Sequence, residues 1–196
     1  CPGAIGVAAL RHVGTKVGFS DVGPALAIAA PGGNCVNIGA GEPCLYPILT
    51  TIDSGTTVPL ASTYTDSFDA SVGTSFSSPL VAATAALMLS AQPALTPAGV
   101  RAALQATARP FPSSGVADDP SLGPIVGCHA PNGVEQLQCY CTTGTCGAGM
   151  LDAGAAVRAA IGARVAIGVS PAAPQAGQAV MLSGDGSTVA SGRSIA

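Results

Sequence analysis

The chain has 196 residues, of which 48% are hydrophobic and only 9% are charged, so it can build the packed core of one sizeable domain. A disordered chain is excluded, because disorder goes with low hydrophobicity and high charge. A nucleic-acid partner is not expected either, since the formal net charge is −3 and no cluster of lysine or arginine occurs.

No membrane span is predicted. Arg158 and Arg164 interrupt the most apolar C-terminal stretch, so no run of about 18 uninterrupted apolar residues remains. The chain does not begin with methionine, and no basic segment followed by an apolar one opens it. The first residue is therefore expected to be a cut or processed end.

Short apolar runs near the N-terminus predict strands. Residues 4–10 (AIGVAAL) and 26–30 (LAIAA) are bounded by glycine and proline, which is typical of buried strands in a parallel sheet. Residues 48–52 (ILTTI) are a third candidate strand of this kind.

Helical patterns follow the predicted strands. The first predicted helix covers about 77–91, and the second covers 97–107, with Thr96 as N-cap and Pro97 at the first helical position. A third helix is predicted over 152–161, capped by Asp152 or a neighbour. The long connection over 110–149 is predicted to be a loop held by disulfides.

The cysteines form two local clusters and one isolated residue. They are Cys35 with Cys44, Cys128 with Cys139, Cys141 and Cys146, and Cys1 alone. An even number in each cluster allows local disulfides, which predicts that the protein is secreted or lies in another oxidising compartment. A Cys35–Cys44 bridge is expected, three pairings are open in the second cluster, and Cys1 would pair with a cysteine upstream.

A metal site is the alternative interpretation of the second cluster. His129 adjoins Cys128, and the spacing of the cluster could supply four zinc ligands, although no CxxC pair is present.

The character of the chain changes after residue 162. Strand-like segments at 165–169 and 179–182 are separated by proline, glycine and serine, as at the start of a β-sandwich module. We therefore expect a first unit over 1–162, and a linker with the start of a truncated β-sandwich module over 163–196.

Residues 73–89 (GTSFSSPLVAATAALML) place small hydroxyl residues at the start of the first predicted helix. A serine in the first turn of a helix lies where backbone N–H groups are unsatisfied, so its hydroxyl can attack a carbonyl while its N–H holds the developing oxyanion. Gly73 would permit close approach of a substrate, and Pro79 is expected within the opening turn. A hydroxyl cap on a structural helix is the alternative, and the local pattern alone favours it.

The longer pattern resembles a known family. GTSFSSPLVAATAALML followed by QPALTPAGVRAALQATA is similar to the nucleophile segment of the subtilisin-like (S8 family) serine peptidases. CPGAIGVAAL, VGFSDVGPALAIAAPGG and CGAGMLDAGAAV resemble further segments of that family in the same order, over about residues 1–162.

The resemblance implies both fold and function. The fold would be α/β, with this chain supplying the C-terminal portion of a mostly parallel sheet flanked by helices, followed by an incomplete β segment. Ser75 would be the nucleophile of a serine endopeptidase, its backbone N–H one oxyanion donor, and the substrate a polypeptide. Phe76 stands where the family commonly has methionine, and Asp21 where it often has asparagine, at a turn position read as structural.

In the family the Asp-Gly and His-Gly-Thr motifs lie upstream of the strand that residues 4–10 resemble, and this sequence has neither motif there. His12 and His129 are not in a His-Gly-Thr context, and Asn34 and Asn37 are not in the Ala-Gly-Asn context of the family's oxyanion asparagine. The resemblance therefore implies that a missing N-terminal part of the catalytic domain carries these groups. The chain alone is expected to be inactive, because Ser75 has no base to activate it.

Two other functions are compatible with the sequence. One is a non-catalytic binding protein on a peptidase fold, and the other is a hydrolase of ester-like substrates that uses the same serine. No cofactor is identified. The family resemblance would allow structural calcium, but the ten acidic residues form no recognisable ligand loop, so no metal ligand is assigned.

Overall fold

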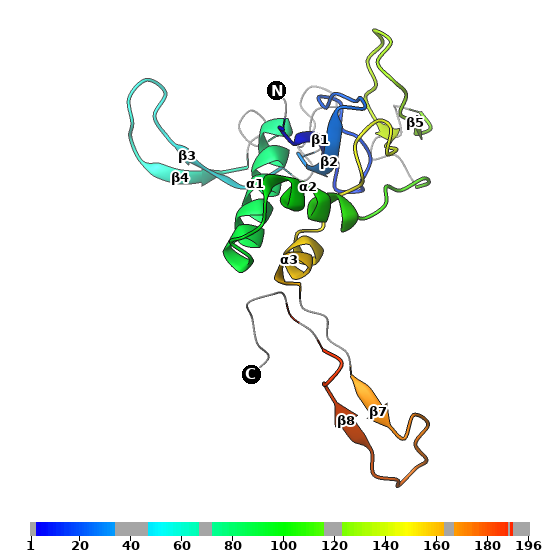
Figure 1. The fold of residues 1–196 in the computed structure, drawn as a ribbon. Helices are drawn as coiled ribbons and strands as arrows, with labels where there is room; N and C mark the ends of the chain where they lie inside the picture. Colours follow the sequence, from blue (N-terminus) through cyan, green and yellow to red (C-terminus); the bar gives the residue numbers. More distant parts are fainter. Residues whose placement is uncertain are drawn as a thin grey trace.

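The computed structural model describes residues 3–33, 47–66, 72–115, 123–162, 167–187 and 189. The elements in chain order are β1 (Gly6–Leu10), β2 (Leu26–Pro31), β3 (Thr50–Asp53), β4 (Ser62–Thr65), α1 (Thr74–Ala91), α2 (Pro97–Ala106), β5 (Val126–Gly127), β6 (Cys139–Tyr140), α3 (Ala153–Ile161), β7 (Gly168–Ser170) and β8 (Met181–Ser183). In Figure 1 the helices gather beside β1 and β2, while the β3–β4 and β7–β8 hairpins project away from them.

A parallel pair of strands lies at the centre of the α/β unit. β1 and β2 are in register from Val7 opposite Ile28 to Leu10 opposite Pro31. Their apolar, largely alanine sequences suit strands that are covered on both faces, and both lie where the sequence predicts strands.

The two faces of this strand pair are covered by different material, because successive side chains in a strand point to opposite faces. Ile28 and Ala30 of β2 lie in a core cluster with residues of α1, α2 and α3. Ala29 of β2, together with Ala8 and Leu10 of β1, packs against the buried cysteines of the 128–146 region. The layers are therefore helices, strands and a disulfide-linked loop.

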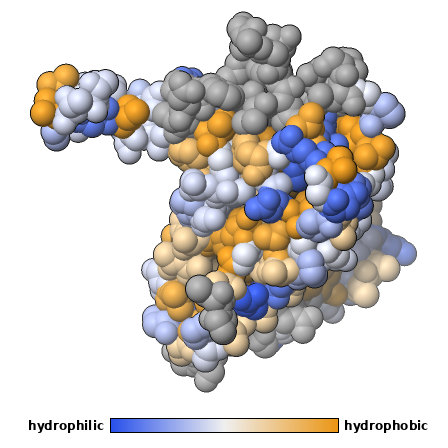
Figure 2. All heavy atoms as spheres, turned by 90° about the horizontal axis from the view of Figure 1, so that it is seen from above, coloured by the Kyte–Doolittle hydropathy of each residue, from blue (hydrophilic) through white to orange (hydrophobic). Residues whose placement is uncertain are grey.

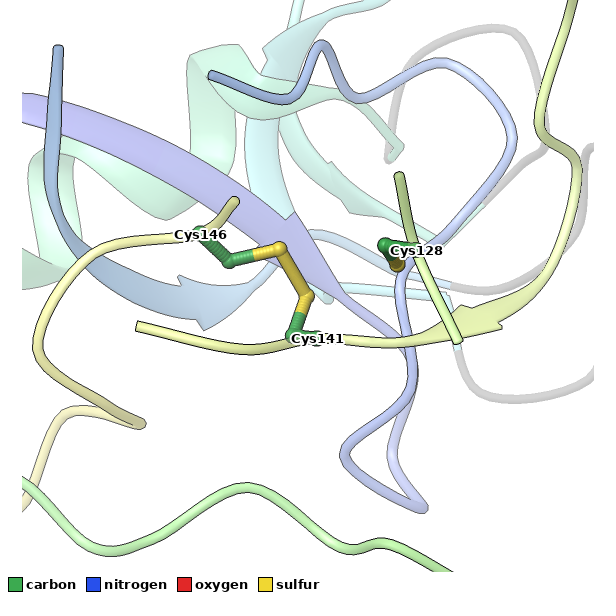
Figure 3. Close-up of side chains that lie close together, drawn as sticks. All are labelled: Cys128, Cys141 and Cys146. Carbon is green, nitrogen blue, oxygen red and sulfur yellow. A yellow bond between two sulfur atoms is a disulfide. The ribbon is translucent and has the colours of Figure 1, made fainter. Parts of the chain in front are cut away.

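Two disulfides hold that loop. Cys128 is bonded to Cys139 and Cys141 to Cys146, which resolves the pairing that the sequence left open. Figure 3 shows Cys128 beside the Cys141–Cys146 bridge, and the Sγ atoms of these three residues lie within 4.8 Å of one another.

The zinc interpretation of this cluster is wrong for the chain in this state, because each of its four sulfurs is already in a covalent bond and no thiolate is left to bind a metal. The expected Cys35–Cys44 bridge and Cys1 lie outside the described residues.

The loop returns along the free edge of β2. Ala29 N donates to Gly149 O at 2.9 Å, and Leu151 N donates to Ala29 O at 2.8 Å, so residues 149–151 run beside β2 as a short parallel bridge. β2 thus has hydrogen-bonded neighbours on both edges. The short pair β5–β6 inside the loop was not predicted from the sequence.

The caps of α2 and α3 follow the predicted chemistry. Thr96 Oγ1 accepts from Gly99 N at 3.1 Å, with Pro97 at the start of α2. Asp152 Oδ1 accepts from Ala155 N at 2.8 Å, and Gly162 ends α3 in the left-handed conformation with φ 64°.

Helix α1 begins at Thr74, earlier than the sequence periodicity indicates, so Pro79 is its sixth residue rather than part of the opening turn. Pro79 has no N–H, and the carbonyl of Ser75 therefore receives no helical hydrogen bond from it. By length and composition alone α1 could also cross a membrane; one side of it packs against β1, β2 and α3, and 22% of it is buried.

The prediction of a buried parallel strand at residues 48–52 is wrong. β3 instead pairs antiparallel with β4, and Thr51, Ile52 and Asp53 are exposed. The two threonines favour an extended conformation but supply no apolar face, so this segment suits an exposed hairpin rather than a buried parallel sheet.

The β3–β4 hairpin carries exposed apolar side chains. Its turn is ordered by Asp53 Oδ1, which accepts from the backbone N–H groups of Gly55 and Leu60, both at 2.8 Å. Ile52, Val58, Leu60 and Tyr64 are exposed. Figure 2 shows hydrophobic atoms at the tip of the projecting hairpin and a hydrophobic strip across the middle of the same face of the molecule.

The C-terminal residues form a separate antiparallel hairpin. β7 pairs with β8, with Val169 opposite Leu182, and nearly all of its residues are exposed. Strands therefore occur close to the two predicted positions, whereas the boundary at residue 162 and the sandwich module stay predictions.

Candidate active site

The geometry at the start of α1 shows whether a hydroxyl side chain caps this helix. The N-cap is Gly73, which has no side chain, and no side-chain cap hydrogen bond is made there. Gly73 has φ 141°, a conformation that L-residues rarely adopt, so glycine is required for the chain to turn into the helix. The hydroxyls of Thr74 and Ser75 are thus not used as the helix cap.

Ser75 lies in the first turn of α1 with an exposed side chain. Its backbone N–H is among the first four of the helix, which have no carbonyl of an earlier turn to bond. The positive end of the helix dipole adds to the field at this position. Among the described residues, Ser75 Oγ makes no hydrogen bond, so the hydroxyl is available to an external group.

The neighbours of Ser75 are held by other bonds. Phe76 N donates to Gly73 O at 3.0 Å, which closes the first turn, and Ser78 Oγ donates to Thr74 O at 3.1 Å within the helix. Phe76 itself is half-buried beside the exposed serine.

A buried stripe anchors α1 to the core. Its fully buried members follow helical spacing, and they are Ser77, Val81, Thr84 and Met88. This stripe faces β1, β2 and α3, and Ser75 lies on another side of the helix. The nucleophile candidate is therefore exposed while the helix that carries it is fixed to the sheet.

Neither histidine of the sequence is placed as a base for Ser75 within the described residues. His12 is exposed in the connection after β1. His129 is exposed in the disulfide loop, with Nδ1 2.8 Å from Ala130 O. Asn34 and Asn37 lie outside the described residues. Within the described residues the candidate site therefore consists of the serine and its supporting elements.

Residues that anchor this site were missed by sequence reasoning. Ser77 Oγ donates to the carbonyl of Pro31, the last residue of β2, and Gly73 N donates to the carbonyl of Gly32. The sequence signal that could have identified Ser77 is its position as the first member of the buried helical stripe. Sequence alone could not identify its partner, because Pro31 is 46 residues away.

A hollow in the described structure lies away from Ser75. It has a volume of about 570 Å³ and lies between residues 18–22 and residues 131–136 of the disulfide loop. Ser75 is not among its lining residues, so this hollow is not a substrate cleft for the serine.

Lys16 lies at the edge of that hollow and is buried. Its Nζ donates to the carbonyl oxygens of Val17 at 2.9 Å and Gly18 at 3.0 Å, and also to that of Gln136 in the disulfide loop. Burial lowers the pKa of Lys16 from 10.5 to about 8, although Glu135 and Asp21 act in the opposite direction. Lys16 therefore connects the segment after β1 to the loop at some electrostatic cost.

The fold agrees with comparisons to known proteins. The sequence profile of the subtilase family, peptidase family S8, matches residues 1–141. The chain belongs to the subtilase family. The match ends inside the disulfide loop, so the resemblance of residues 146–157 to the closing helix of the family remains a sequence observation.

The chain is similar to two known proteases. It is 35% identical, over 162 residues, to an extracellular protease of Xanthomonas campestris pathovar campestris. This alignment covers 82% of the chain and 20% of that protein. It also resembles a solved protease structure from Pseudoalteromonas arctica, with 30% identity and a TM-score of 0.56 over 82% of this chain and 37% of that one. The chain thus spans about a fifth of the length of the Xanthomonas protein and well under half of the solved chain.

Proposed function

We propose that this chain supplies the nucleophile Ser75 to a serine endopeptidase. The observation that carries the proposal is an exposed serine, free of any capping role, in the first turn of a helix anchored in the core of a subtilase-type fold. The subtilase relationship and the two proteases that the chain resembles support a polypeptide as the substrate.

The proposed reaction follows the two-step route of serine peptidases. Ser75 Oγ attacks the peptide carbonyl carbon, a base removes the hydroxyl proton, and the C–N bond breaks as that proton passes to the leaving amine. Water then adds to the acyl-enzyme and restores the free hydroxyl. The backbone N–H of Ser75 lies where it can donate to the oxyanion that forms in both steps.

The base, its orienting aspartate and the side-chain oxyanion donor would come from the missing N-terminal part of the catalytic domain. α1 supports this proposal, because it has no charged residue in 18 positions and yet buries only one stripe. Leu80, Leu87 and Leu89 on its other sides are exposed. A helix that is apolar all round is normally covered all round.

We further propose that residues 1–162 are the C-terminal part of a peptidase domain and that 163–196 lead into a β-sandwich module. The two disulfides, together with the extracellular protease that the chain resembles, support secretion.

Labelling by a phosphonyl fluoride tests the proposal. The whole protein should be labelled on Ser75 and should cleave a casein substrate, and Ser75→Ala should abolish both. The 196-residue chain alone should show neither, because loss of the catalytic base lowers kcat about 10⁶-fold in subtilisin.

Two outcomes would contradict the proposal. Whole protein that cleaves casein equally well after Ser75→Ala would exclude Ser75 as the nucleophile. Whole protein that is folded but neither labelled nor active would favour a non-catalytic binding protein. Ser78→Ala is the matched control, because Ser78 is exposed and bonds only within α1.

A further inference from the structure

We infer that Ser77 is a positioning residue for Ser75, which it aligns by joining the first turn of α1 to the end of β2. This inference rests on the proposed function of Ser75. The sequence pattern requires only a small residue at position 77, so a role for its hydroxyl goes beyond that pattern.

The hydroxyl of Ser77 is completely buried, with an exposed fraction of 0%. A buried hydroxyl must find a hydrogen-bond partner to avoid a desolvation cost. Ser77 Oγ could have bonded to a carbonyl one turn earlier, as Thr84 does with Leu80 O at 2.8 Å. It instead leaves its own helix and donates to Pro31 O at 3.1 Å.

The acceptor residue ends a strand of the core. Pro31 ends β2, whose residues 27–30 are fully buried, and the next residue, Gly32, donates its N–H to Leu10 O of β1 at 3.0 Å. The carbonyl of Gly32 then accepts from Gly73 N at 2.9 Å. Residues 31–32 therefore bond β1 on one side and the start of α1 on the other.

Close packing at Gly32 indicates that this junction is built tightly. A Cβ atom at Gly32 would lie 2.7 Å from the Cβ of Ala9, 2.8 Å from Ser77 Oγ and 3.1 Å from Gly73 O. Since real Cβ contacts are not this short, only glycine lets the helix approach β2 closely enough for the Ser77 bond.

Through the geometry of the helix, the Ser77 bond also fixes the direction of the Ser75 side chain. Two residues along an α-helix correspond to a rotation of about 200°, so when Ser77 faces β2 the side chain of Ser75 faces away from it. The Gly73 and Ser77 bonds hold the backbone on both sides of Ser75. Rotation or sliding of the first turn would break them, so together they fix where the nucleophile points.

The test compares Ser77→Ala with Thr84→Val in the whole protein. Both changes remove a buried hydroxyl from the same stripe of α1, but only the first removes a bond to β2. Complete titration with a phosphonyl fluoride counts the folded active sites, so that kcat for casein-derived peptides is expressed per active molecule.

For Ser77→Ala we expect kcat to fall on the order of tenfold with KM nearly unchanged, and the rate of labelling to fall in parallel. For Thr84→Val we expect both rates to stay close to the wild-type values, whatever happens to thermal stability.

Wild-type turnover per titrated site in Ser77→Ala, or an equal loss in Thr84→Val, would overturn the positioning role and leave the proposed function intact. If the wild-type protein showed no activity that depends on Ser75, the proposed function itself would fall, and the positioning role with it.

Discussion

Ser75 and Ser77 have chemically identical side chains, but one lies in solvent and the other in the core. Ser75 is exposed in the first turn, whereas Ser77 is fully buried and bonded to Pro31 O. The motif predicts the first assignment through its similarity to a family. The second required the position of β2, because nothing local distinguishes a buried hydroxyl from a small space-filling side chain.

The ionisation of Lys16 should affect the stability of the folded chain. Its pKa is lowered to about 8 in the folded chain, chiefly by burial. In the unfolded chain the side chain has the ordinary lysine pKa of 10.5. Between these values the unfolded chain still holds the proton that the folded chain has released. The stability contribution of this group therefore rises as pH increases from about 8 to 10.5.

We expect Lys16→Met to abolish this dependence, because methionine fills the site without titrating. Thermal unfolding of the whole protein at several pH values between 7 and 10.5 measures the difference. The melting temperature of the wild type should rise relative to that of Lys16→Met across this window. Parallel profiles for the two proteins would show that Lys16 does not titrate there.

At the scale of elements, β2 organises the chain. It pairs with β1 on one edge, with residues 149–151 on the other, and supplies the acceptor for Ser77 at its end. The presence of β1 and β2 was predictable from two apolar runs bounded by glycine and proline. The pairing of residues 149–151 with the second edge of β2 was not predictable, since this segment is short and has no strand pattern.

Gly147 permits that second contact, and replacing it should be costly. It has φ 85°, and a Cβ there would lie 2.3 Å from Ala27 C and 2.4 Å from Ile28 N, which are backbone atoms of β2 that cannot move aside. We expect Gly147→Ala to lower the free energy of unfolding by about 3 kcal/mol or more, because strain and displacement of β2 add together.

Gly133→Ala is the matched control for this change. Gly133 has φ 84°, but a Cβ there would meet nothing within 4 Å, so it isolates the backbone strain, which is about 1–2 kcal/mol. Urea unfolding of both variants of the whole protein compares them. Equal losses would mean that the contact with β2 contributes nothing.

At the scale of the whole molecule, the described residues leave α1 incompletely covered. Leu87 is 58% exposed on a helix with no charged residue. If the N-terminal part of the domain that we propose covers this side of α1, Leu87 is a core residue of the whole protein.

Leu87→Asp should then destabilise the whole protein by several kcal/mol, because it would bury an unpaired carboxylate. Ser90→Asp adds the same charge near the end of the same helix without removing an apolar contact, and should cost much less. Soluble yield and melting temperature measure both. A Leu87→Asp protein as stable as Ser90→Asp would mean that this side of α1 stays in water.

The sequence by itself determined the family, the nucleophile candidate, the capped helices α2 and α3, and the two buried strands, because each depends on local pattern or chemistry within a few residues. Tertiary structure decided the disulfide pairing, the hairpin nature of residues 50–65 and the bond from Ser77 to Pro31. The Ser77 bond joins residues 46 positions apart, the hairpin depends on which face of a strand is covered, and the disulfide pairing depends on which of several nearby cysteines meet in space. Local composition encodes none of these properties, and only the packed chain specifies them.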